Sequence, residues 1–162
     1  MQRWITISLA LCGFAMDTSL AEGPKIYYVV RHAEKAANEG NPPLTAAGEE
    51  RAKQLASLLK TLRVSEAFCS SNELRAQQTA QALDETPTAI PSMALLLAKL
   101  RSLEGGTSTL VVSHSGDVEK IVNGLSGVMV PAIGENYDNL FIVVVNGDSK
   151  QVTHLKYGQA AP

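Results

Sequence analysis

The sequence predicts a three-layer α/β/α sandwich with a mostly parallel central sheet and an antiparallel hairpin at its C-terminal edge. Short β-branched runs alternate with amphipathic segments of about ten to seventeen residues, and such crossover helices must cover both faces of a parallel sheet. The length of 162 residues and the hydrophobic share of 45% fit one globular domain.

The first half of the domain alternates strand and helix. Residues 25–30 form a continuous β-branched and aromatic run, which is typical of a buried strand. Residues 66–69 are a second short strand, and Ser70-Ser71-Asn72 caps a helix from about residue 73 to residue 83. Between the strands, Thr45 is the expected N-cap of a helix. The inward face of that helix carries small or apolar residues at three- and four-residue spacing: Gly48, Ala52, Leu55, Leu59 and Leu62.

The next segments repeat this alternation. Residues 87–91, bounded by two prolines, are expected to form a brief irregular or edge segment. A serine-capped helix over residues 93–103 precedes a strand at residues 109–113. A turn at Gly116 then starts a helix whose apolar positions share one face: Val118, Ile121, Val122 and Leu125.

The C-terminal part predicts the hairpin. Residues 140–145 are the longest β-branched run, and Asn146-Gly147 after them is a strong turn signal. Residues 151–157 are therefore expected to return antiparallel as an edge strand.

The N-terminus differs from the rest of the chain. A short cationic start, an apolar run over residues 4–16 and the small-x-small triplet Ser19-Leu20-Ala21 are typical of a secretory signal. We expect residues 1–21 to be a signal peptide and residues 22–162 the domain, exported to the periplasm or secreted. A retained membrane anchor is the alternative, disfavoured because the apolar run is short. The mature chain would keep only Cys69, expected as a small buried hydrophobe.

The overall charge excludes one class of partner. A net charge of −2 and a pI of about 5.9 give no broad basic surface for nucleic acid. Any site for an anion must therefore be local.

Such a site is predicted at one edge of the sheet. Arg31 and His32 follow the first strand, His114 follows the strand at 109–113, and Arg75 opens the helix after the second strand. Because the carboxyl ends of parallel strands meet at one edge, we expect these side chains to cluster. The two guanidiniums suit a doubly charged oxyanion, and like-charge repulsion favours a neutral His32 that can act as a nucleophile.

A metal site is the alternative for two histidines. Zinc needs a third protein ligand, and neither Cys69 nor His154, expected to be a surface residue, is well placed to supply it. We therefore expect no metal.

Several motifs, in order, resemble the histidine phosphatase superfamily. They are Arg31-His32-Ala33-Glu34 with Asn38, Leu44-Thr45-Ala46-Ala47-Gly48, Ser70-Ser71 followed by Arg75-Ala76-Gln77-Gln78-Thr79-Ala80, and Val112-Ser113-His114-Ser115-Gly116. The match covers most of residues 26–125, and Ala33 stands where the family has glycine. Ordered motifs are more specific than an isolated Arg-His pair.

The resemblance implies roles for these residues. His32 would be the phosphorylated nucleophile, Arg31, Arg75 and His114 would form the phosphate pocket, and Asn38 would be an additional phosphate contact. No cofactor would be required. The family's acid motif is missing, so the proton donor is left open among Glu34, Glu85 and Asp117.

The expected activity is hydrolysis of phosphomonoesters or phosphoramidates through a phosphohistidine. The small domain leaves little room for the insertions of a mutase. Export favours a phosphorylated small molecule or envelope component as substrate, by analogy with exported relatives. The alternative, from another class, is a non-catalytic phosphate-binding or interaction protein that kept the pocket and lost the acid.

Overall fold

The computed structural model describes residues 23–64, 66–81, 83 and 86–158. The expected signal peptide lies outside the described residues. The elements in chain order are β1 (Lys25–Arg31), α1 (Ala46–Lys60), β2 (Glu66–Cys69), α2 (Leu74–Gln81), β3 (Thr88–Ala89), α3 (Met93–Ser102), β4 (Ser108–Ser113), α4 (Asp117–Ser126), β5 (Asn139–Asn146) and β6 (Ser149–Lys156). In the described part of the chain, no helix is long and apolar enough to cross a membrane.

The central sheet has the strand order β3-β2-β4-β1-β5-β6. The first four of these strands are mutually parallel, whereas β5 is antiparallel to both β1 and β6. The expected mostly parallel sheet with a C-terminal antiparallel hairpin is confirmed. β5 alone reverses, so β6 runs in the direction of β1. The segment at residues 87–91 contributes the short edge strand β3.

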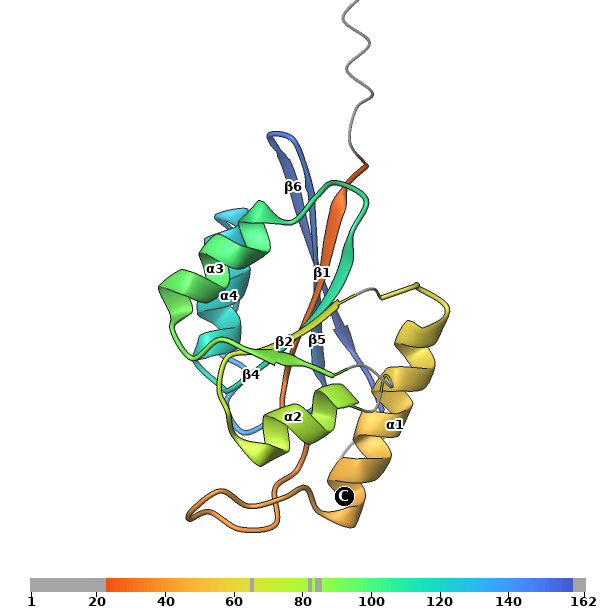
Figure 1. The fold of residues 1–162 in the computed structure, drawn as a ribbon, viewed down its shortest axis with the longest axis vertical. Coiled ribbons are helices and arrows are strands. Elements are labelled where there is room, and N and C mark those ends of the chain that lie inside the picture. The colour runs from red at the N-terminus through yellow and green to blue at the C-terminus, as the bar shows by residue number, and fades with distance from the viewer. Residues whose placement is uncertain (1–22, 65, 82, 84–85, 159–162) are drawn as a thin grey trace, which may run out of the picture.

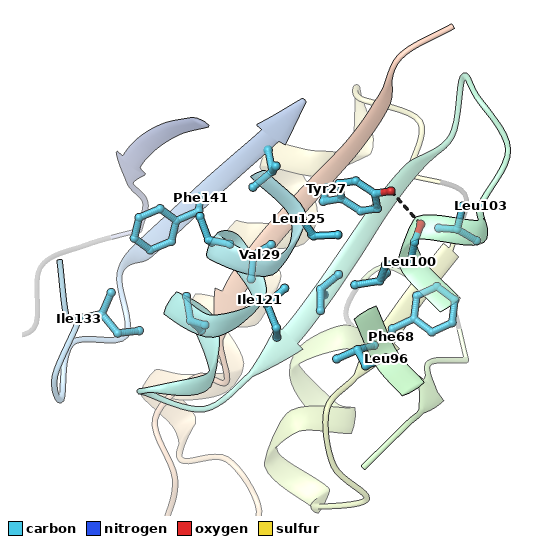
Figure 2. Packing of buried hydrophobic residues seen from close by; sticks show 14 residues of the cluster. Tyr27, Val29, Phe68, Leu96, Leu100, Leu103, Ile121, Leu125, Ile133 and Phe141 are labelled. Atoms are coloured by element: carbon cyan, nitrogen blue, oxygen red, sulfur yellow. Dashed lines mark hydrogen bonds between the residues drawn. The ribbon is translucent and has the colours of Figure 1, made fainter. Parts of the chain in front are cut away.

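The helices form two layers around the sheet (Figure 1). The alternation of β1 sends Tyr27 and Val29 into the cluster under α3 and α4, and Tyr28 and Val30 into the cluster under α1 and α2. Figure 2 shows the first cluster, in which the Tyr27 hydroxyl donates to the Leu100 carbonyl oxygen at 2.8 Å. Because β1 is covered on both faces, its last residues are held rigidly at the sheet edge.

The helix faces match the sequence pattern with one exception. The Thr45 hydroxyl accepts from Gly48 N at 3.0 Å, as expected of an N-cap. The predicted inner positions of α4 are all buried: Val118, Ile121, Val122 and Leu125. Leu62, predicted on the inner face of the first helix, is 41% exposed because α1 ends at Lys60.

Candidate active site

The carboxyl ends of β1 and β4 bring the predicted residues together. Arg31 pairs in register with Ser113, and His32 N donates to the Ser113 carbonyl oxygen at 2.8 Å. The rings of His32 and His114 consequently face each other edge to face, with centroids 5.1 Å apart. We call the side chains of Arg31, His32, Arg75 and His114 the rim cluster.

The tautomer of His32 follows from its hydrogen bonds. Nδ1 lies 2.7 Å from the Ala33 carbonyl oxygen, which can only accept, so Nδ1 carries the proton. In the neutral ring the lone pair is therefore on Nε2. That atom accepts a hydrogen bond from Nε of Arg75 at 3.2 Å.

His32 is held in its neutral form. It is 2% exposed, and burial lowers its pKa to about 4. The hydrogen bond to Ala33 opposes this shift, whereas His114, Arg31 and Arg75 add to it by charge repulsion. At neutral pH Nε2 is accordingly unprotonated.

The guanidiniums of Arg31 and Arg75 each form an ion pair with a carboxylate. Arg31 pairs with Glu135 at 3.0 Å and also donates to the Gly134 carbonyl oxygen at 3.0 Å. Arg75 pairs with Glu73 at 2.6 Å. Nε of Arg31 is buried and has no hydrogen-bond partner among the described residues, so the pocket contains an unused donor.

Glu73 is a rim residue that the sequence analysis missed. One of its carboxylate oxygens lies 2.7 Å from His114 Nε2, which must therefore carry the proton of this hydrogen bond. The Ser71 hydroxyl donates to the same oxygen at 3.2 Å. Burial opposes the charged form of Glu73, but His114 and Arg75 outweigh it and keep the pKa of Glu73 below its ordinary value. The sequence pattern placed Glu73 at the start of the helix after β2 and gave the capping role to Ser70, Ser71 and Asn72, so Glu73 received no role at the rim.

The segment between α4 and β5 borders the rim cluster on one side. The Tyr137 ring lies under the Arg31 guanidinium, 4.3 Å from Cζ to the ring centroid, and 5.8 Å from the His32 ring. Glu135 belongs to the same segment. Neither residue stands in a motif, so their approach to the site was not predicted.

The proton-donor candidates lie differently from expectation. The Glu34 carboxylate is bound by Arg51, whose Nε lies 2.8 Å from one of its oxygens. Asp117 pairs with Lys120 at 2.8 Å, in the first turn of α4. Glu85 lies outside the described residues.

Three further expectations concern the surroundings of the rim cluster. Asn38 is exposed, and within the described chain it makes no hydrogen bond to the rim cluster. A helix start ordinarily leaves its first N–H groups without partners, but in α4 those of Asp117 and Val118 donate to the His114 carbonyl oxygen. His154 is exposed on β6, where Nε2 lies 2.8 Å from Asn139 Oδ1.

The remaining metal candidates do not converge. Cys69 is fully buried in β2, and burial raises the pKa of its thiol to about 12. Across the described residues, no group of three or more His, Cys, Asp or Glu side chains is arranged to hold a metal ion.

Comparison with known proteins places the chain. A model of the histidine phosphatase superfamily (branch 1) matches residues 27–96, the segment that contains Arg31, His32 and Arg75. The chain belongs to this superfamily. No curated protein matches the sequence.

Solved structures of histidine phosphatase relatives share the fold. The protein histidine phosphatase SixA complexed with tungstate is 22% identical, with 81% of this chain and 96% of that chain covered and a TM-score of 0.65. A phosphoserine phosphatase from Entamoeba histolytica, in complex with 3-phosphoglyceric acid, is 15% identical, with 84% and 98% covered and a TM-score of 0.58. A phosphoglycerate mutase from Plasmodium falciparum is 17% identical, with 86% and 95% covered and a TM-score of 0.59.

In this member of the superfamily, the other motif residues hold the loop that carries the nucleophile candidate. Ala33 N donates to the Thr79 hydroxyl at 3.0 Å, and Leu44 N donates to Gln78 Oε1 at 2.8 Å. Gly48 packs so closely on the loop that a Cβ there would lie 2.3 Å from the Glu34 carbonyl oxygen. The superfamily motifs therefore build a support for His32 as well as a pocket.

Proposed function

We propose that this protein is a phosphatase that hydrolyses phosphomonoesters or phosphoramidates through a phosphohistidine on His32, without a metal or other cofactor. The observation that carries the proposal is the state of the His32 ring. Its Nδ1 proton is committed to Ala33, which leaves the Nε2 lone pair at the rim cluster for attack on phosphorus.

The charges around Nε2 support phosphoryl transfer. Two guanidiniums and the Nε2–H group of His114 surround it, and fixed donors aimed at equatorial phosphoryl oxygens stabilise the transition state. The buried, unpartnered Nε of Arg31 would gain an acceptor when an oxyanion enters. Such donors supply positive charge from the protein itself.

The relatives support the same class of ligand. SixA is a protein histidine phosphatase and its structure holds tungstate, a tetrahedral oxyanion like phosphate. The second relative is named as a phosphatase of phosphoserine, and its structure holds 3-phosphoglyceric acid. From these relatives we transfer to this protein the hydrolysis of phosphate compounds at a site for an oxyanion. We do not transfer a particular substrate.

The substrate proposal depends on export. Removal of residues 1–21 would deliver the domain to the periplasm or outside the cell, where phosphorylated small molecules or envelope components are accessible. Cell fractionation with N-terminal sequencing tests this. Uncleaved protein in the cytosol would remove the envelope substrates and favour a cytosolic phosphate compound.

The test of the activity uses the purified protein with a generic aryl phosphate between pH 5 and 8. We expect phosphate release that a chelator does not reduce and that His32→Gln abolishes. Acid quenching during turnover should trap an acid-labile, base-stable phosphoryl group on the wild-type protein. Activity that survives in His32→Gln would exclude His32 as the nucleophile.

A non-catalytic phosphate-binding protein is the second candidate. The observation that favours it is that Glu34 and Asp117 are engaged by Arg51 and Lys120. It predicts that phosphate or tungstate stabilises the protein against heat without any turnover of aryl phosphates. Turnover that depends on His32 would exclude it.

A further inference from the structure

We infer that Glu73, a residue outside the expected acid positions, is the general acid and base of the proposed phosphatase. In this inference, which rests on the proposed function, the Glu73 carboxyl protonates the leaving group when His32 attacks. The resulting carboxylate then takes a proton from the water that hydrolyses the phosphohistidine.

The first argument is position. The guanidinium of Arg75 connects the two groups: its Nε donates to His32 Nε2 at 3.2 Å, and one of its terminal nitrogens donates to Glu73 at 2.6 Å. Glu73 thus lies across one phosphate-binding group from the nucleophile. The leaving group departs on the side of phosphorus away from the attacking nitrogen, so an acid on the far side of Arg75 from His32 can reach it.

The second argument is access to solvent. The side chain of Glu73 is 36% exposed, against 2% for His32 as a residue. A general acid must recover its proton from water in each cycle, and a general base must meet water. Glu34 is less exposed, at 18%, and is bound by Arg51. Asp117 is about as exposed as Glu73, at 35%, but it pairs with Lys120 and not with a residue of the rim cluster.

The third argument is a change of charge on binding. In the structure, Arg75 and His114 both donate to Glu73 and favour its carboxylate form. An entering phosphate group recruits these two donors to its own oxygens. Glu73 then loses two hydrogen-bond donors, one of them the Arg75 cation, and gains an anionic neighbour, and both changes favour its protonation.

The chemical steps balance. Nε2 of His32 forms a bond to phosphorus while the bond from phosphorus to the leaving atom breaks, and the leaving atom takes the proton of Glu73. Water then attacks the phosphohistidine and gives its proton to the Glu73 carboxylate. The P–N bond breaks, its electron pair returns to Nε2, and inorganic phosphate leaves. No oxidant, reductant or further reactant takes part.

The alternative role for Glu73 is that of a counterion that blocks the pocket until phosphate displaces it. The two roles differ in their dependence on the leaving group. A general acid matters most for a poor leaving group such as an alkyl alcohol and least for dinitrophenolate. A blocking counterion affects all phosphate esters equally.

The experiment measures kcat/KM of the purified full chain for a series of phosphate esters that ends in an alkyl phosphate and in 2,4-dinitrophenyl phosphate. We expect Glu73→Gln to lose about a hundredfold to ten-thousandfold on the alkyl phosphate, while it stays within about tenfold on the dinitrophenyl ester. When reactions of Glu73→Gln with the dinitrophenyl ester are quenched, they should show more phosphoryl group on His32 than those of the wild type, because the variant lacks the base for the second step. Asp117→Asn, the matched control at the same rim, should leave the dependence on the leaving group unchanged.

The outcomes separate the two levels of the proposal. An equal loss on every ester, a gain in activity, or a shift of the dependence to Asp117→Asn would overturn the assignment of Glu73. Full activity of His32→Gln would instead overturn the proposed function, whatever Glu73→Gln does. A wild-type protein without turnover on any ester would overturn both. Thermal unfolding checks that each variant is folded.

Discussion

Nε of Arg75 donates a hydrogen bond to Nε2 of His32 at 3.2 Å, so the guanidinium covers the lone pair that a nucleophile needs. In the proposed mechanism, phosphate would therefore have to bind this guanidinium before His32 could attack. Arg75 would thus bind the phosphate group and, by the same change of partner, release the lone pair of His32. Its fork geometry matters as much as its charge.

Replacing Arg75 by lysine tests this fork. The lysine keeps the positive charge. Its single ammonium group, however, cannot replace the separate, fixed N–H donors with which a guanidinium contacts both His32 and an oxyanion. We expect kcat/KM to fall by about ten- to hundredfold, which corresponds to the loss of one charged hydrogen bond of about 1.5–3 kcal/mol. Arg63→Lys, at an exposed position, is the control and should match the wild type. Equal rates for both variants would show that charge alone suffices.

The acidic limb of activity should lie well below the ordinary histidine range. Burial, the main cause, lowers the pKa of His32 to about 4, and only the neutral ring can attack. We expect His32 to titrate near pH 4 when its ring resonances are followed by NMR from pH 3 to pH 8. The phosphorylation rate should decline only as pH approaches that value, after correction for ionisation of the substrate. A midpoint near 6.5 would contradict the described burial.

The same pKa shift predicts how stability depends on pH. The unfolded chain binds a proton at His32 near pH 6.5, while the folded chain resists it until about pH 4. His32 thus costs nothing above pH 6.5 and destabilises the fold progressively as pH falls toward 4, by about 3 kcal/mol in total. His114, whose pKa is lowered mainly by burial, adds a contribution of the same sign.

Urea unfolding at several pH values measures this effect. The free energy of unfolding of His32→Gln should fall less between pH 6.5 and pH 4 than that of the wild type, because the variant keeps His114 but lacks His32. Parallel curves for the two proteins would show that His32 is not held neutral.

Gly48→Ala should damage both stability and activity. The new Cβ would lie 2.3 Å from the Glu34 carbonyl oxygen, and backbone there cannot move without displacing the loop that follows His32. We expect a loss of about 1–3 kcal/mol in the free energy of unfolding, against a helix-propensity gain of about 1 kcal/mol.

Gly124→Ala is the matched control in α4. Its Cβ would meet the flexible side chain of Leu97 at 2.7 Å, which can shift. Chemical denaturation and aryl phosphate turnover of both variants make the comparison. A smaller loss of stability for Gly48→Ala than for Gly124→Ala would show that the loop tolerates the contact.

Glu135→Gln should strengthen the binding of phosphate. Glu135 pairs with Arg31, and its side chain is 87% exposed, so a phosphate group competes with it for the guanidinium. We expect inhibition by inorganic phosphate to tighten a few-fold at low ionic strength and less at high salt, since exposed ion pairs are weak and screened. Weaker inhibition would instead show that Glu135 positions Arg31 for the ligand.

The strands and the rim cluster were predictable because they depend on local pattern. The run ending at Arg31 and the run ending at Ser113 predict parallel strands, and parallel strands must place His32 and His114 at one edge. The tautomer of His32 was not predictable, because it depends on the direction of one ring nitrogen toward the Ala33 carbonyl oxygen.

The parts that sequence reasoning missed depend on long-range approach. A glutamate near a helix start usually complements the helix dipole, so the position of Glu73 indicates no contact with His114, which lies at the end of another strand. Glu135 and Tyr137 reach Arg31 only because the chain after α4 passes the rim before it enters the reversed strand β5. No residue pattern in that segment indicates this path.

One arginine links the first loop of the domain to the residue that follows its last strand. Arg51 binds the Glu34 carboxylate and also donates to the Tyr157 carbonyl oxygen at 3.2 Å. During translation, His32 emerges from the ribosome more than a hundred residues before Tyr157 does. A nascent chain therefore carries His32, Arg31 and Arg75 for much of its synthesis before Arg51 can bind Tyr157. The contact that joins the loop after His32 to the C-terminal segment forms only when that segment has been made.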